Sequence, residues 1–125
     1  MSAEPRGGRL RPDTRAIGEA KERIAESFLT TQGLTLVARN HRCRRGEIDL
    51  VMRDASILVF VEVRYRRSAR FGTAAATVDA RKQQRLILAA RHYLLMHPTQ
   101  LACRFDVVAI GAQDDIEWIK QAFTL

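Results

Sequence analysis

The sequence predicts an α/β fold with one mixed β-sheet flanked by helices or, on the same pattern, an α+β sandwich. Length is the first observation, because 125 residues are enough to bury one core and too few for two ordinary domains. Composition is the second, since 46% hydrophobic and 28% charged residues are typical of a folded globular chain. The third is the order of the predicted elements, namely helix, three strands, helix and two strands, which favours a single sheet packed between helices.

Two segments have the spacing of amphipathic helices. Between residues 16 and 32, apolar side chains recur every three or four positions, and Gly33 follows where such a helix would stop. A second apolar stripe covers residues 78–96 and ends before Pro98. Lys82 lies on that stripe, where a lysine is unusual. It is expected either to extend past the edge of the core into solvent or to act near the functional site.

Five segments are predicted as strands because they are rich in β-branched and apolar residues and are bounded by turn-forming residues. The strongest is 57–65, and a basic turn at 39–46 separates the first two strands. Residues 68–76 are small and polar, and are predicted to form a loop that lets a ligand approach closely. The predicted strands are 34–39, 47–52, 57–65, 104–110 and 116–119.

The N-terminal segment differs from the rest of the chain. Residues 1–13 contain prolines, glycines and arginines without an apolar period, so a disordered basic arm is expected before a single domain at 14–125. The segment also lacks the apolar stretch of a secretory signal. No apolar run exceeds the five residues 57–61, whereas a membrane span needs roughly 18. A cytoplasmic protein is therefore expected.

The chain is strongly basic, with 21 Lys and Arg against 14 Asp and Glu and a formal net charge of +7. A basic surface favours a polyanion such as DNA, because each neutralised phosphate releases counterions. Basic runs also occur as ordinary solvated faces, but these flank the acidic motifs along the chain. The candidate nucleic-acid-binding residues are Arg42, Arg44, Arg45, Arg66, Arg67, Arg70 and Lys82.

Two short acidic motifs stand in predicted strands: GEIDL at 46–50 and VFVEVR at 59–64. Side chains alternate between the two faces of a strand, so Glu62 and Arg64 share one face. If the two strands form a hairpin with residues 55 and 56 at its tip, the acids come into register. The opposed pairs are then Asp49 with Glu62 and Glu47 with Arg64, with Val59, Val61 and Val63 on the other face.

The opposed carboxylates of Asp49 and Glu62 require a cation between them. Two unit charges about 4 Å apart repel by about 4 kcal/mol at an effective dielectric of about 20. One candidate is Mg²⁺ or Mn²⁺, since oxygen donors without a His or Cys cluster suit a hard divalent cation. The other is an ion network in which Arg64 and neighbouring arginines neutralise the acids. Asp106, in the fourth predicted strand, is expected to be a structural acid paired with an arginine.

Several motifs, in their order along the chain, resemble those of the YraN-like family of small bacterial proteins. They are Gly18-Glu19, Arg39-Asn40, GEIDL, VFVEVR, Lys82, RFDVV at 104–108 and the segment 118–123, so that the resemblance extends from about residue 14 to residue 123. The resemblance implies a restriction-endonuclease-like fold, similar to the PD-(D/E)xK nucleases and closest to the Holliday-junction resolvases. It also implies a metal-dependent DNA endonuclease that acts on branched or other non-B DNA, and a homodimer.

The resemblance further implies roles for individual residues. By position, Asp49 and Glu62 would bind Mg²⁺ or Mn²⁺ with the carbonyl of Val63, and Glu19 would be the catalytic acid contributed by the first helix. Arg64 stands where the nuclease pattern has lysine. An arginine stays protonated, so it can stabilise negative charge on a phosphate but cannot act as a general base. The alternative function is a nucleic-acid-binding or partner-binding module that keeps the fold without turnover.

Overall fold

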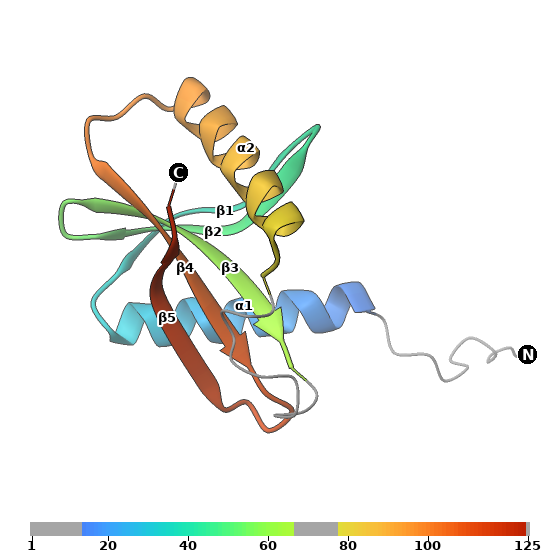
Figure 1. Ribbon diagram of the computed structural model, residues 1–125. Helices are drawn as coiled ribbons and strands as arrows, with labels where there is room; N and C mark the ends of the chain where they lie inside the picture. The colour runs from blue at the N-terminus through green and yellow to red at the C-terminus, as the bar shows by residue number, and fades with distance from the viewer. Residues whose placement is uncertain (1–13, 67–77, 125) are drawn as a thin grey trace, which may run out of the picture.

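The computed structural model describes residues 14–66 and 78–124 (Figure 1). The arm predicted at 1–13 and the loop predicted at 68–76 lie outside the described residues. Neither helix in the described ranges is long and apolar enough to cross a membrane. The elements, in the predicted order, are α1 (Thr14–Thr31), β1 (Thr35–Cys43), β2 (Gly46–Asp54), β3 (Ile57–Tyr65), α2 (Ala80–Met96), β4 (Ala102–Ile110) and β5 (Ile116–Phe123).

The strands form one mixed sheet in the order β1-β2-β3-β4-β5. Neighbouring strands are antiparallel except for β3 and β4, which run parallel. A tight turn cannot join a parallel pair, and α2 lies in the crossover connection between these two strands. The predicted α/β class is confirmed: the protein has a restriction-endonuclease-like mixed sheet flanked by helices.

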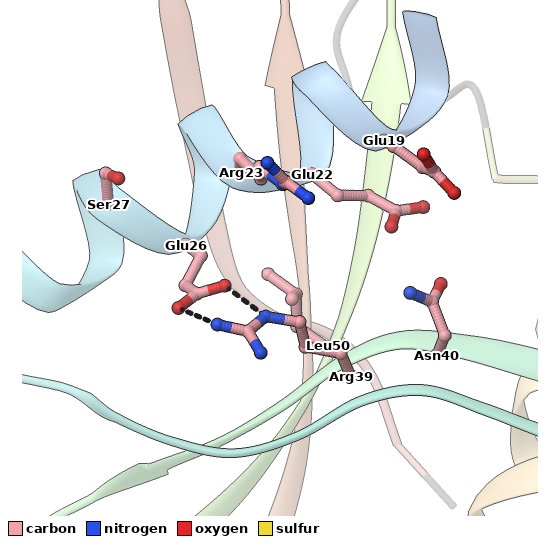
Figure 2. Close-up of a pocket in the computed structure, with 8 residues that line it drawn as sticks. All are labelled: Glu19, Glu22, Arg23, Glu26, Ser27, Arg39, Asn40 and Leu50. Atoms are coloured by element: carbon pink, nitrogen blue, oxygen red, sulfur yellow. Dashed lines mark hydrogen bonds and ion pairs between the residues drawn. The ribbon is translucent and has the colours of Figure 1, made fainter. Parts of the chain in front are cut away.

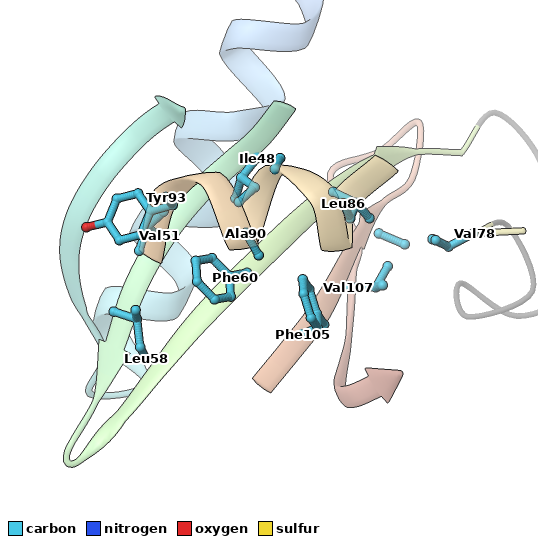
Figure 3. Close-up of a cluster of buried hydrophobic side chains, with 12 residues drawn as sticks. Ile48, Val51, Leu58, Phe60, Val78, Leu86, Ala90, Tyr93, Phe105 and Val107 are labelled. Atoms are coloured by element: carbon cyan, nitrogen blue, oxygen red, sulfur yellow. The ribbon is translucent and has the colours of Figure 1, made fainter. Parts of the chain in front are cut away.

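The two helices cover opposite faces of the sheet. α2 packs through residues such as Leu86 and Tyr93 against a cluster that includes Phe60 (Figure 3). α1 packs through Leu29 against a second cluster that includes Val61. Because Phe60 and Val61 are consecutive residues of one strand, their side chains point to opposite faces, and both faces of β3 are buried.

Helix α2 begins at Ala80, two residues later than the predicted boundary. The side chain of Asp79 caps the helix by accepting the backbone N–H of Lys82 at 2.9 Å. Val78 stays outside the helix but is buried in the α2-side core, which explains why its apolar side chain extended the predicted stripe. The cap places Lys82 in the first turn of α2.

The β2–β3 hairpin has the predicted tip and register. Residues 55 and 56 form the turn, and Ala55 adopts a positive φ of 53°. Backbone pairing runs from Asp54–Ile57 to Leu50–Val61. In the β1–β2 hairpin the strands are longer than predicted, because pairing continues to Cys43 and Gly46 and leaves only residues 44 and 45 in the turn.

Candidate active site

The alternation of side chains along β2 breaks at Asp49. Leu50 packs in the cluster on the α1 side of the sheet, and a regular strand would place Ile48 on the same side. Ile48 packs in the cluster on the α2 side. On the neighbouring strand β1, Asn40 lies at the same level and adopts a left-handed φ of 51°. Both strands are therefore irregular at Asp49.

This irregularity lets the Asp49 side chain reach the backbone of β3. Its Oδ2 accepts the N–H of Val63 at 2.8 Å. In a regular continuation of the hairpin, that N–H would donate to the carbonyl of Ile48. The Asp49 carboxylate thus takes the place of a backbone acceptor where the β2–β3 ladder ends.

Glu62 lies beside Asp49 on the α2 side of β3. Its side chain is only 5% exposed, and its Oε2 lies 3.2 Å from Nη1 of Arg64. The same oxygen lies 3.6 Å from Nζ of Lys82. One buried carboxylate oxygen therefore has two cationic neighbours, one from its own strand and one from the first turn of α2.

The carboxyl groups of Asp49 and Glu62 lie close enough together for the charge of Glu62 to affect the pKa of Asp49. Burial, followed by the negative charge of Glu62, raises the pKa of Asp49 to about 8, although the N–H of Val63 acts to lower it. At neutral pH the pair therefore carries a proton. In the protein alone, this proton and the cations Lys82 and Arg64 supply the positive charge that the two acids require.

The predicted proximity of Asp49 and Glu62 is confirmed, but the two are not a regular ladder pair, because β2–β3 pairing stops one residue earlier. Glu47, predicted opposite Arg64, makes an ion pair with Arg42 at 3.4 Å. The predicted valine face is also confirmed. The valines that lie in or against the α1-side cluster are Val59, Val61 and Val63.

Helix α1 contributes Glu22, which the sequence motifs did not single out. The side chains of Asn40 and Asp49 lie near its carboxyl group, and both act to lower its pKa. Burial raises the pKa of Glu22, and the nearby charge of Glu47 adds to this increase. A third carboxyl group is therefore linked to the acidic pair, from the opposite side of the sheet to Lys82.

Glu19, the acid that the family resemblance implies for α1, lies one turn before Glu22. Its side chain is 57% exposed and lies 3.9 Å from the guanidinium of Arg15. Both acids line a cavity of about 470 Å³ between α1 and β1 (Figure 2). With Glu26, which also lines it, they recur at helical spacing. That acidic stripe is the sequence signal that could have identified Glu22.

The donor set at Asp49 and Glu62 fits a hard divalent cation. Mg²⁺ in enzymes is typically bound by one or two carboxylates, with water and substrate phosphate completing its ligands. The N–H and C=O of a strand residue point to the same side, so the carbonyl of Val63 faces the side on which Asp49 lies. Among residues 14–66 and 78–124, no cluster of three or more His, Cys, Asp or Glu side chains could enclose a metal. The two carboxylates and the Val63 carbonyl are thus the candidate ligands.

The basic residues predicted to bind nucleic acid lie in different parts of the molecule. Arg66 follows β3, and its side chain, 16% exposed, makes a 3.1 Å ion pair with Glu117. Arg67 and Arg70 lie outside the described residues. Exposed on the β1–β2 hairpin, around the same cavity as Lys82, are Arg42, Arg44 and Arg45.

Several known proteins are similar to this chain over most of their length. The model of "Uncharacterised protein family UPF0102" matches residues 21–110. The UPF0102 protein of Saccharophagus degradans is 54% identical over 110 residues, which cover 86% of this chain and 92% of the relative. The UPF0102 protein of Klebsiella pneumoniae is 51% identical over 121 residues, covering 94% and 91%. The YraN-like resemblance is thereby confirmed, and the chain belongs to the UPF0102 family.

Proposed function

We propose that this protein is a metal-dependent endonuclease of the PD-(D/E)xK type that hydrolyses phosphodiester bonds in DNA. The observation that carries the proposal is the meeting of Asp49, Glu62 and Lys82 where the β2–β3 ladder ends. Two adjacent carboxylates suit a divalent cation, and an ammonium group beside them suits the negative charge that develops on a phosphate under attack. This combination favours phosphodiester hydrolysis.

Asp49 and Glu62 would hold the cation with the carbonyl of Val63. When bound, Mg²⁺ or Mn²⁺ would supply a water of lowered pKa and stabilise charge on the phosphate. The N–H of Val63 fixes the orientation of the Asp49 carboxylate. Asp49 must first lose the proton that it holds at neutral pH, so proton and cation compete for the same oxygens.

In the nuclease pattern a lysine stands at the position that Arg64 occupies in β3. Here Lys82, from α2, supplies an amine at the site instead. Its Nζ lies 3.6 Å from Oε2 of Glu62, and its side chain remains 34% exposed, so it can reach a bound phosphate. Arg64 contacts the same oxygen, at 3.2 Å. Lys82 is therefore assigned to stabilise charge on the attacked phosphate, and Arg64 to orient Glu62.

The expected substrate is DNA, because the protein is strongly basic and exposed arginines of the β1–β2 hairpin lie around a cavity that Lys82 also lines. Phosphate contacts position a protein on DNA without reading its sequence. The family resemblance favours branched or other non-B DNA and a homodimer. A cytoplasmic location, expected from the sequence, would give access to such DNA.

One observation favours the alternative function, a nucleic-acid-binding or partner-binding module without turnover. Glu62 already has two cationic neighbours, and Asp49 already has an N–H donor and a proton at neutral pH. The acids are therefore compensated by groups of the protein itself. Such an ion network can persist as a structural feature of a nuclease fold that has lost its activity.

A cleavage assay separates the two functions. The wild type would be incubated with duplex, single-stranded, flap and four-way-junction DNA in Mg²⁺, Mn²⁺ or EDTA. Cleavage that requires the cation is expected, and Asp49→Asn and Glu62→Gln should each reduce it by about 100-fold or more. Asp114→Asn is the matched control, because Asp114 is exposed and its only described partner outside its own turn is Lys21. Cleavage that survives in both site variants or in EDTA would contradict the assignment, and a folded wild type that cuts none of these DNAs would favour the alternative.

A further inference from the structure

We propose that a cavity between the β1–β2 hairpin and the start of α2 binds a backbone phosphate of DNA, next to the phosphate attacked at Asp49 and Glu62. The inference rests on the proposed function for the identity of the ligand, and it adds a substrate-binding site to that function. It also gives a role to Arg85, which the sequence motifs did not connect with nucleic acid.

The cavity has a volume of about 440 Å³ and a strongly cationic lining. Among the residues that the structure describes, five cationic side chains line it, against a single carboxylate, that of Glu47. Glu47 is itself paired with Arg42 at 3.4 Å, so most of the positive charge is left for a ligand. The cationic lining residues are Arg42, Arg44, Arg45, Lys82 and Arg85.

Close backbone packing brings the two walls of this cavity together. A Cβ atom at Gly46 would lie 2.5 Å from the carbonyl oxygen of Arg85 and 3.1 Å from its carbonyl carbon. Only a residue without a side chain allows the hairpin to approach α2 so closely. The arginines of the hairpin are thereby held beside Arg85 and Lys82 by the fold itself.

Lys82 connects the cavity with the carboxylate pair. It lines the cavity, and its Nζ lies 3.6 Å from Oε2 of Glu62. A phosphate in the cavity would therefore be separated from the acids by one lysine side chain. A DNA strand that places one phosphate at Glu62 can place a nearby phosphate of the same strand in the cavity.

The lining residues also indicate what the cavity recognises. Within residues 14–66 and 78–124, the lining includes no aromatic side chain on which a base could stack. Arginine and lysine donate hydrogen bonds to phosphate oxygens, and contacts of this kind carry no sequence information. The cavity is thus suited to sequence-independent binding of the DNA backbone.

Binding to a fluorescently labelled DNA duplex in EDTA tests this site without cleavage. In the cavity variant, Arg44→Ala and Arg85→Ala are combined, and both side chains are exposed. The matched control combines Arg53→Ala and Arg91→Ala, two exposed arginines outside the cavity, one of them on the same helix. The affinity of the cavity variant for the duplex should fall by about 10-fold or more. The salt dependence of its binding should decrease by the equivalent of about two phosphate contacts. The affinity of the control should fall by less than about threefold.

Equal weakening in both variants would mean that only net charge matters, and would overturn the proposal, as would unchanged binding in the cavity variant. Glu47→Gln should strengthen binding, because it removes a carboxylate from the lining. The outcome is separable from that of the nuclease assay. Weak binding by the cavity variant supports the cavity even if the wild type cuts no DNA, whereas a wild type that cuts and a cavity variant that binds normally would overturn the cavity alone.

Discussion

The carboxylate of Asp49 accepts the backbone N–H of Val63 at 2.8 Å, and this bond replaces the next hydrogen bond of the β2–β3 ladder. The end of regular pairing and the position of the acid are therefore one structural feature. The group that holds the Asp49 carboxylate beside Glu62 is a backbone N–H of β3. The position of this carboxylate therefore does not depend on a second, flexible side chain as its hydrogen-bond donor.

Stability should fall as the pH rises from about 4 to about 8. Burial and then Glu62 raise the pKa of Asp49 from its ordinary 3.8 to about 8, so the folded state holds a proton that the unfolded chain releases. The resulting stabilisation is complete below the unfolded pKa and is lost as the pH passes the folded pKa. One such proton gives a slope of up to about 1.4 kcal/mol per pH unit. Urea unfolding at several pH values measures the free energy of unfolding of the wild type and of Asp49→Asn. This free energy should depend less on pH in the variant. An equal pH dependence in both proteins would contradict the raised pKa of Asp49.

Replacing Lys82 by methionine should reduce kcat by a larger factor than it raises KM, because Lys82 both contacts Glu62 and lines the proposed phosphate-binding cavity. The variant keeps the apolar stem but removes the ammonium group beside Glu62, and loss of one electrostatic donor typically costs about 10²- to 10³-fold in kcat. Arg81→Met is the matched control, because Arg81 is an exposed cation of the same helical turn. Lys82→Arg should recover part of the rate. A variant Lys82→Met with full kcat would exclude Lys82 from the reaction.

Replacing Gly46 by alanine should destabilise the fold by about 1–3 kcal/mol, the usual range for forcing an extra methyl group into a packed contact. The new Cβ would meet the carbonyl of Arg85 in α2. Gly18→Ala is the opposite case: a Cβ there meets nothing within 4 Å, so helix propensity should stabilise α1 by about 0.5–1 kcal/mol. Chemical unfolding measures both changes. Equal stability of Gly46→Ala and the wild type would mean that the hairpin does not pack so closely on α2.

Much of the fold follows from local patterns in the sequence. The order of elements and the register of the β2–β3 hairpin could be predicted, because periodicity and a two-residue turn are local properties. Asp106 is the predicted structural acid: it is fully buried and accepts two hydrogen bonds from Arg104, at 2.9 and 3.1 Å. Its other donor side chain, Trp118, is 12 residues away at 3.0 Å and could not be inferred from spacing.

The rest of the site depends on contacts between distant segments. Strict alternation predicts that Asp49 continues a regular ladder, and the irregularity shared with Asn40 becomes visible only when β1 lies beside β2. The acidic stripe on α1 does not reveal that Glu22 is an acid whose pKa Asp49 affects. For Lys82 the sequence leaves two alternatives, and the crossover of α2 over β3 brings it beside Glu62.

The most direct test of the metal site is calorimetric titration of the protein with Mg²⁺ or Mn²⁺ at pH 7, in buffers of different ionisation enthalpy. Because Asp49 holds a proton below its pKa of about 8, binding should release close to one proton for each cation. Asp49→Asn should abolish this release and weaken binding, whereas the control Asp114→Asn should match the wild type. Absence of binding to the wild type, or equal binding and proton release by Asp49→Asn, would contradict the assignment of Asp49 and Glu62 as the metal ligands.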